Sequence, residues 1–347
     1  MNIMQVLITG GAGYIGSHTV KELNKRGFET VVYDNLRKGH QEAVLAGEFV
    51  HGDLSDLDTL RQTFNKYRID SVIHFAADSE VGESVSNPAK YFQNNVVNGL
   101  NLLRVMLENE VKNIVFSSTA AVYGEPKRTP ILESDVTIPT NPYGESKLIF
   151  ENILKHYEIA YGLKYISLRY FNAAGADPSG LIGEDHKPET HLIPIVLQTA
   201  LGLRKEVGIF GTDYDTPDGT CIRDYIHVID LAEAYILSLE SLAQGKGSSI
   251  YNLGNGKGYS VKEVMETAMK VTHHEIKTVL SERRQGDPSV LVASSEKIMK
   301  ELNWKPKYEK LETIIADAWR WHKNYYAKTD PLLFGQFVLQ CPTFEDE

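Results

Sequence analysis

The sequence predicts an α/β fold: a doubly wound parallel sheet with helices on both faces, and a smaller C-terminal α/β lobe. Three observations indicate this fold. An apolar run at 5–9 leads straight into a glycine-rich turn and then into residues with helical spacing. Apolar runs and amphipathic segments alternate through the first half of the chain. Two of these runs are followed by acids, Asp34 and Asp53, as is common at the carboxyl edge of a parallel sheet.

The glycine-rich turn, Gly10-Gly-Ala-Gly13-Tyr-Ile-Gly16, predicts a dinucleotide site. Gly10 permits a tight turn, Gly13 lets the backbone approach a pyrophosphate, and Gly16 allows close packing of the following helix. Unpaired N–H groups at the start of that helix would bind the phosphates. A glycine triplet alone is weak support, so its place between a strand and a helix carries the prediction.

Asp34 follows the strand expected at 29–33, at the distance typical of an acid that binds ribose hydroxyls. A carboxylate there repels a 2′-phosphate, so Asp34 favours NAD over NADP. Arg37 and Lys38 lie nearby and leave this preference open. Asp53, after the strand at 49–51, is a candidate for binding the adenine amino group.

The remaining elements are expected from their periodicity. Further strands are predicted at 71–75, 113–116, 164–169 and 249–253, and helices at 17–26, 56–67, 88–109, 143–161, 192–203, 228–243, 261–271 and 311–325. The alternation is looser after about residue 170. We therefore predict a dinucleotide-binding domain at 1–170, to which later segments return, a second lobe at 171–330, and a tail at 331–347.

The composition excludes several classes of protein. Lys and Arg number 36 against 46 Asp and Glu, a net charge of −10, so we expect no surface for nucleic acid or anionic lipid. No apolar run is long enough to span a membrane. Cys221 and Cys341 are far apart and form no ligand-spaced cluster. This favours a reducing, cytoplasmic compartment and argues against structural zinc, so we expect no metal.

Tyr143 and Lys147 are four residues apart, so one helical turn brings a phenol and an ammonium side by side. A fixed positive charge stabilises the phenolate and lowers the tyrosine pKa from about 10, which makes Tyr143 a usable proton acceptor. The same spacing is common on amphipathic helices without any catalytic role. The pair alone would favour that second interpretation.

A series of motifs, in order along the chain, resembles a known family. TGGAGYIG, DNL, FSSTAAVYG and NPYGESK are similar to the extended short-chain dehydrogenases/reductases, whose cofactor domain is Rossmann-like. LRYFNAAGADPSG, GEDHKPETHLIP, FGTDYDTPDGTCIRDYIHVIDLA and RRQGDPSVLVAS resemble the UDP-glucose 4-epimerases of that family. The similarity runs from residue 5 to about residue 321. The tail from residue 331 lies outside it.

The resemblance implies a role for each matched residue. Tyr143 would be the catalytic acid/base, Lys147 would lower its pKa and bind the nicotinamide ribose, and the Thr119 hydroxyl would bind the reacting sugar oxygen. Cofactor contacts are implied for Gly10, Gly13, Tyr14, Ile15, Gly16, Asp34, Asn35, Asp53, Leu54, Phe75, Ala76, Ala77, Asn95, Ser117, Tyr143, Lys147 and Tyr170. Substrate contacts are implied for Thr119, Tyr143, Asn172, His191, Leu192, Ile209, Phe210, Arg223, Arg284, Asp287 and Leu291.

The implied reaction interconverts UDP-glucose and UDP-galactose in galactose metabolism. The sugar is oxidised at C4 with bound NAD, the 4-keto sugar turns over, and C4 is reduced on its opposite face. Two interpretations stay open, a nucleotide-sugar 4,6-dehydratase and a non-catalytic dinucleotide-binding regulator. Ala120 and Ala121 stand where dehydratases have an acidic pair, and regulators usually lack the Tyr/Lys pair.

The resemblance also bears on specificity and assembly. Leu291 stands where a Tyr restricts relatives to glucose and galactose, so we expect UDP-GlcNAc and UDP-GalNAc to be accepted less efficiently. Alternatively, Leu291 merely packs in the core. The helices at 88–109 and 143–161 resemble the pair through which the family forms homodimers, so a homodimer is expected.

Overall fold

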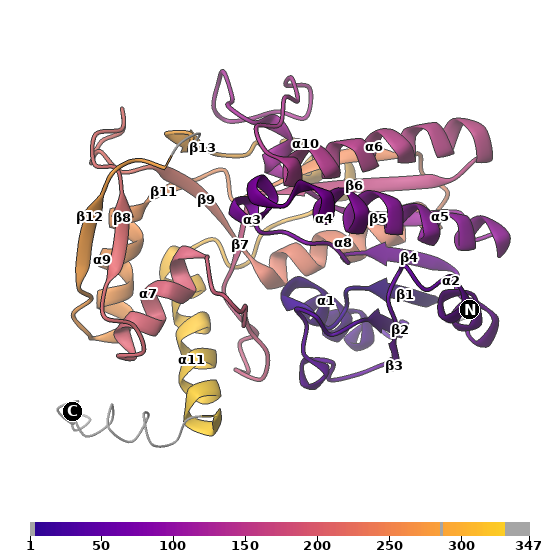
Figure 1. Ribbon diagram of the computed structural model, residues 1–347, viewed down its shortest axis with the longest axis horizontal. Coiled ribbons are helices and arrows are strands. Elements are labelled where there is room, and N and C mark those ends of the chain that lie inside the picture. The colour runs from indigo at the N-terminus through magenta and orange to yellow at the C-terminus, as the bar shows by residue number, and fades with distance from the viewer. Residues whose placement is uncertain (1–3, 285–286, 330–347) are drawn as a thin grey trace.

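The computed structural model describes residues 4–284 and 287–329, which form a large helix-covered sheet and a smaller lobe beside it (Figure 1). The large sheet has seven parallel strands in the order β10-β6-β5-β4-β1-β2-β3. Its strands are β1 (Gln5–Thr9), β2 (Glu29–Asp34), β3 (Glu48–His51), β4 (Ser71–His74), β5 (Asn113–Thr119), β6 (Lys164–Tyr170) and β10 (Ser249–Leu253). Strand order reverses between β1 and β4, where open α/β sheets bind ligands. The predicted doubly wound sheet is confirmed.

Two apolar cores lie on opposite faces of this sheet. Val6 and Ile8 of β1 belong to one core with Leu23, whereas Leu7 belongs to the other with Leu102. A strand buried on both faces reads as a continuous apolar run, which explains the sequence at 6–8. The first core is covered by α1 (Tyr14–Lys25), α8 (Val228–Ala243) and α10 (Glu296–Leu302), and the second by α2 (Leu57–Lys66), α5 (Asn98–Glu108) and α6 (Pro142–Tyr161).

Local sequence signals fix the ends of α6. The Asn141 side chain accepts a hydrogen bond from the Gly144 N–H, and Pro142 occupies the first helical position. Gly162 ends the helix in the left-handed conformation, with φ of 70°. These signals place Tyr143 in the first turn, with Lys147 one turn later.

The single helix expected at 88–109 is three segments: α4 (Pro88–Phe92), the π-helical turn η2 (Gln93–Val97) and α5. Asn95 in this turn is buried, and its amide donates to the Asp78 carbonyl and to the Ser146 hydroxyl. The predicted extent of the helical segment is therefore right, but the prediction of one continuous α-helix is wrong. Periodicity could not show the π turn, because its partners are far away in sequence.

The smaller lobe combines short strands with helices. One sheet contains β7 (Asn172–Ala174), β9 (Ile222–His227), β11 (Gly258–Ser260) and β13 (Val290–Leu291), and β8 (Val207–Phe210) pairs with β12 (Thr278–Ser281). The core of the lobe includes side chains of α7 (Leu192–Ala200), α9 (Val261–Thr272) and α11 (Leu311–Thr329).

The two parts are not consecutive in the chain. Strand β10 pairs with β6, and α8 and α10 pack on the large sheet, although all three follow residue 171. The boundary at residue 170 stays a prediction, and the tail predicted at 331–347 lies outside the described residues. No helix in the described ranges combines the length and apolar character needed to cross a membrane.

Candidate active site

Thr119 and Tyr143 meet at the carboxyl edge of the large sheet. Thr119 is the last residue of β5, and its register partner, Tyr170, is the last residue of β6. Tyr143 lies in the first turn of α6 and hydrogen-bonds to Thr119. Both are nearly buried, with 7% of Thr119 and 6% of Tyr143 exposed. The predicted acid/base and its hydroxyl partner are therefore together.

Lys147 lies one turn further along α6. Its ammonium donates to the Ser117 carbonyl at 2.8 Å and lies 5.9 Å from the centre of the Tyr143 ring. The Ser117 hydroxyl is 3.2 Å from the Tyr170 hydroxyl. With Thr119, five of the predicted residues thus surround the ends of β5 and β6.

The electrostatics of this pair differ from the sequence expectation. Burial raises the pKa of Tyr143 well above its ordinary value, Tyr170 adds to the rise, and the hydrogen bond to Thr119 opposes it. Burial lowers the pKa of Lys147 to about 7, and the charge of Glu151 partly opposes that shift. The expectation that Lys147 lowers the tyrosine pKa is wrong for the chain by itself, because burial is the largest influence on both groups and Lys147 is not among the causes of the Tyr143 shift.

A buried ion pair lies behind the site. The Arg169 guanidinium donates to both carboxylate oxygens of Glu151, at 2.9 and 2.5 Å, and to the Tyr123 hydroxyl at 2.9 Å. The Ser118 hydroxyl donates to the same carboxylate at 2.5 Å. This network joins α6 to β5 and β6 next to Thr119. Sequence analysis missed it, although Glu151 lies one turn beyond Lys147 on α6.

The glycine turn fits a dinucleotide pyrophosphate. A Cβ at Gly10 would lie 2.5 Å from the Ala76 nitrogen, and one at Gly16 would lie 2.4 Å from the Gly10 oxygen, so both positions require glycine. A Cβ at Gly13 would meet only the Gly10 oxygen, at 3.4 Å, and would otherwise project into open space that a pyrophosphate could fill. No side chain caps α1, and its first turn carries no acid. Its first N–H groups can therefore serve an anion.

The predicted ribose and adenine residues surround this turn. The Asp34 carboxylate accepts hydrogen bonds from the N–H groups of Ala12 and Leu36, at 3.0 and 2.8 Å. The Asn35 amide donates to Asp53 at 2.6 Å. The other predicted cofactor residues lie at the ends of strands or helices: Tyr14 and Ile15 in the first turn of α1, Leu54 after β3, Phe75, Ala76 and Ala77 after β4, and Asn95 in the π turn.

The predicted substrate residues of the lobe form two groups. Arg223 of β9 donates to Asp287 at 2.6 Å and pairs in register with Leu291 of β13. The Arg284 guanidinium lies 3.9 Å from the centre of the Phe210 ring, next to Ile209 in β8. The other three predicted residues lie at the starts of elements: Asn172 in β7, His191 as the N-cap of α7, and Leu192 as its first residue.

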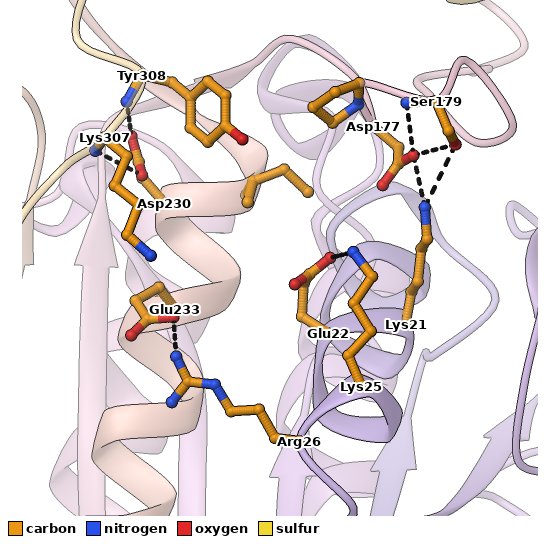
Figure 2. Close-up of a pocket in the computed structure, with 12 residues that line it drawn as sticks. Lys21, Glu22, Lys25, Arg26, Asp177, Ser179, Asp230, Glu233, Lys307 and Tyr308 are labelled. Carbon is orange, nitrogen blue, oxygen red and sulfur yellow. Dashed lines mark hydrogen bonds and ion pairs between the residues drawn. The ribbon is translucent and has the colours of Figure 1, made fainter.

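A cavity of about 380 Å³ lies elsewhere, between α1 and α8 (Figure 2). Lys21 pairs with Asp177 at 2.5 Å, and Arg26 pairs with Glu233. None of the residues predicted for catalysis, cofactor or substrate lines this cavity. It is therefore separate from the site described above.

Comparisons with known proteins identify relatives of the chain. Residues 6–254 match the model of the NAD dependent epimerase/dehydratase family. The UDP-glucose 4-epimerase of Halalkalibacterium halodurans is 58% identical over 93% of this chain and 96% of its own length. The structure of the Brucella ovis UDP-glucose 4-epimerase in complex with NAD has a TM-score of 0.89 at 48% identity and covers 91% of this chain and 97% of its own. That of the Bifidobacterium longum UDP-glucose 4-epimerase in complex with NAD⁺ and UDP has a TM-score of 0.87 at 40% identity and covers 94% of this chain and 99% of its own. The chain belongs to the NAD dependent epimerase/dehydratase family.

Proposed function

We propose that this protein is an NAD-dependent isomerase that interconverts UDP-glucose and UDP-galactose by oxidation and re-reduction at C4. The observation that carries the proposal is the buried group of Thr119, Tyr143 and Lys147 at the carboxyl edge of the sheet that holds the glycine turn. The relatives described above are UDP-glucose 4-epimerases, one of them in complex with NAD and another in complex with NAD⁺ and UDP. This proposal agrees with the expectation from the sequence.

The cofactor would be held by residues along the edge of the sheet. The open space at Gly13 and the N-terminus of α1 would take the pyrophosphate, and Asp34 would accept from a ribose hydroxyl. When bound, NAD⁺ supplies the hydride acceptor for the C4–H bond of the sugar. The chain itself contributes position, proton transfer and charge.

Tyr143 is the group proposed to take the proton from the sugar 4-hydroxyl. When the 4-keto group of the sugar is reduced again, the Tyr143 phenol returns the proton to the sugar oxygen. No proton is therefore consumed over a cycle. The Thr119 hydroxyl, already bonded to Tyr143, is placed to bind the reacting oxygen as well. Lys147 in its charged form would favour the phenolate, although burial, which lowers its pKa to about 7, leaves that charge only partly present near neutral pH.

The lobe would hold the nucleotide while the sugar turns over. Arg223 and Arg284 offer planar guanidinium groups, which bind phosphate oxygens in pairs. The Arg223 guanidinium donates to Asp287, and that of Arg284 lies over the Phe210 ring. A diphosphate anchored there leaves the hexose ring free to present either face to the cofactor.

The test is conversion of UDP-galactose by purified protein, with NAD⁺ added if needed. We expect UDP-glucose as the product, and loss of water from the sugar would instead indicate a dehydratase. Tyr143→Phe should lower kcat by about 10²–10⁴-fold while dinucleotide still binds. Tyr157→Phe, on the same helix and away from the sheet edge, is the matched control and should keep the wild-type rate. Absence of any turnover by the wild-type protein would contradict the proposal and favour a regulator.

We further infer a homodimer formed by α6 and the segments that pack beside it. Large apolar side chains are exposed there: Val85 is 64% exposed, Val97 45%, Ile159 74% and Tyr161 52%. Exposed apolar groups on neighbouring elements are typical of interaction surfaces. Light scattering should give twice the chain mass, and Ile159→Lys should shift the protein toward monomer. Val136→Lys changes an equally exposed residue elsewhere and should leave the mass unchanged.

The compartment we infer is the cytoplasm. The Cys221 thiol is free and buried, which fits a reducing environment. Separation of cells into cytoplasmic, membrane and exported fractions, followed by detection of this protein in each, would test the inference.

A further inference from the structure

Four metal-ligating side chains gather in the loop that precedes α7. They are Glu184, His186, Glu189 and His191, and one ligand atom from each lies within 4.8 Å of all the others. The His191 Nδ1 is 2.5 Å from a Glu184 oxygen and 3.6 Å from a Glu189 oxygen. The His186 Nδ1 is 3.1 Å from the same Glu184 oxygen. Two imidazoles and two carboxylates therefore converge on one point.

The charge of this group requires compensation. Glu184 is 5% exposed and Glu189 is 7% exposed, so two carboxylates are buried side by side. Burying like charges together is unfavourable unless positive charge neutralises them. Two protons on the imidazoles could do this, and so could one divalent cation bound by neutral imidazoles.

One atom of the group favours the cation. Glu189 Oε1 accepts the N–H groups of Thr190 and His191, at 2.8 and 2.9 Å. Glu189 Oε2 is buried and has no hydrogen-bond partner among the described residues. A buried carboxylate oxygen left unpaired is costly, and protonating the imidazoles would not pair it. A metal ion bound by this carboxylate would remove that cost.

We propose that Glu184, His186, Glu189 and His191 bind one divalent transition-metal ion of the zinc class. Imidazole nitrogen with carboxylate oxygen suits zinc and similar borderline ions better than magnesium or calcium, which prefer oxygen alone. Tetrahedral ligands at about 2.0–2.2 Å from zinc lie roughly 3.3–3.5 Å from one another. The His186–Glu184 distance of 3.1 Å and the His191–Glu189 distance of 3.6 Å bracket that range. The His191–Glu184 distance of 2.5 Å must lengthen when the ion replaces the proton shared by these two groups.

The ion would join the lobe to the cofactor domain. The His186 ring lies 6.4 Å from the ring of Tyr14, which directly follows Gly13 of the glycine turn. In the same loop, Asp185 lies 3.1 Å from the His40 ring nitrogen of the first domain. Metal binding would therefore order the loop against the glycine turn. The sequence prediction of no metal considered cysteine spacing and gave no weight to this mixed set of His and Glu.

The experiment is metal binding by the full chain, without an affinity tag and stripped by chelator. Dialysis against Zn²⁺ should leave one ion per chain. Co²⁺ should give visible absorption bands without the charge-transfer band of a cysteine thiolate. Because a ligand must be deprotonated to bind the ion, the calorimetric enthalpy should depend on the ionisation enthalpy of the buffer.

Variants assign the ligands. His186→Gln and Glu189→Gln should each weaken Zn²⁺ binding by at least about tenfold, since even outer-shell changes commonly cost 10–100-fold. His156→Gln removes an exposed histidine of α6 and should leave the affinity unchanged. Retention of no ion by wild type would overturn the proposal, as would affinity unchanged in both variants. If the variants do not fold, the wild-type cobalt spectrum still tests the proposal: a thiolate charge-transfer band would show that a cysteine binds the ion and would overturn the proposal. None of these measurements depends on epimerase activity.

Discussion

Lys147 is the most constrained cation of the site. Only 3% of the residue is exposed, and its ammonium is held by the Ser117 carbonyl. Burial lowers its pKa from 10.5 to about 7, so the folded chain releases this proton more readily than the unfolded chain does. Keeping Lys147 charged in the folded protein therefore lowers the free energy of unfolding.

This shift predicts how Lys147→Met changes the pH dependence of stability. Between pH 7 and 10.5 the unfolded wild-type chain binds the lysine proton and the folded chain does not, so its free energy of unfolding rises with pH across that window. Lys147→Met lacks this contribution. Urea unfolding of both proteins, free of cofactor, should show the variant gaining most over wild type below pH 7. A constant difference across the whole range would show that Lys147 is not desolvated.

Leu291 is predicted to set the preference between plain and N-acetylated sugars. It pairs in register with Arg223 and packs, half-buried, against the small core that contains Tyr123 and Phe171. Pocket fits of this kind are worth about 1–3 kcal/mol. Leu291→Tyr should therefore lower kcat/KM for UDP-GalNAc about tenfold or more relative to UDP-galactose, and Leu291→Cys should raise that ratio. An unchanged ratio in Leu291→Tyr would favour a core role alone.

Helix α6 carries the catalytic pair at one end and depends on a buried charge in its middle. Arg169 and Glu151 are 5% and 3% exposed as side chains, so neither charge can be solvated if the other is removed. Breaking such a pair typically costs about 3–5 kcal/mol. We infer that this pair fixes α6 against β6 and so positions Tyr143.

Glu151→Gln tests that inference. We expect a loss of about 3–5 kcal/mol in the free energy of unfolding, because the Arg169 charge stays buried. Glu158→Gln is the matched control: it breaks an ion pair with Lys164 that joins the same helix and strand, but with 44% of the lysine side chain exposed. That change should cost no more than about 1 kcal/mol. Equal losses of unfolding free energy in the two variants would show that the buried pair stabilises α6 no more than the exposed pair does.

Very short elements were the hardest to predict. The helix at 228–243 and the strand at 249–253 have the predicted bounds, because sixteen and five residues of regular pattern define them locally. Strand β13 has two residues and exists only because it pairs with β9, nearly seventy positions earlier in the chain (Val290 with Ile222). The glycine turn and the Tyr143–Lys147 pair carry local motifs, and the His/Glu group lies within residues 184–191. The Glu151–Arg169 pair is visible only after folding.

At the scale of the whole molecule, buried histidines limit stability in acid. Burial lowers the pKa of His18 to about 4 and that of His74 to about 3, and the charge of Lys147 adds to the shift of His74. Below about pH 6.5 the unfolded chain binds these protons and the folded chain does not. Stability is therefore lost as pH falls from 6.5 toward 3–4.

A variant can separate this effect from general acid denaturation. His74→Asn should show a shallower fall in the free energy of unfolding between neutral pH and pH 4 than wild type does, because it lacks one of the histidines that bind a proton only in the unfolded chain. His156→Gln, an exposed histidine, should follow the wild-type slope. A slope unchanged in His74→Asn would mean that His74 is charged in the folded protein.

The return of β10, α8 and α10 to the large sheet has a consequence for biosynthesis. While the ribosome is still translating the second half, β6 is an unpaired edge, and the face that α8 covers, with Val6 and Ile8, is open to water. The sheet lacks its edge strand β10 until residue 253 has emerged from the ribosome. Trp304, fully buried in the same core, is translated later still. The nascent chain should therefore be a client of chaperones that bind apolar segments, from the completion of β6 until residue 304 leaves the exit tunnel.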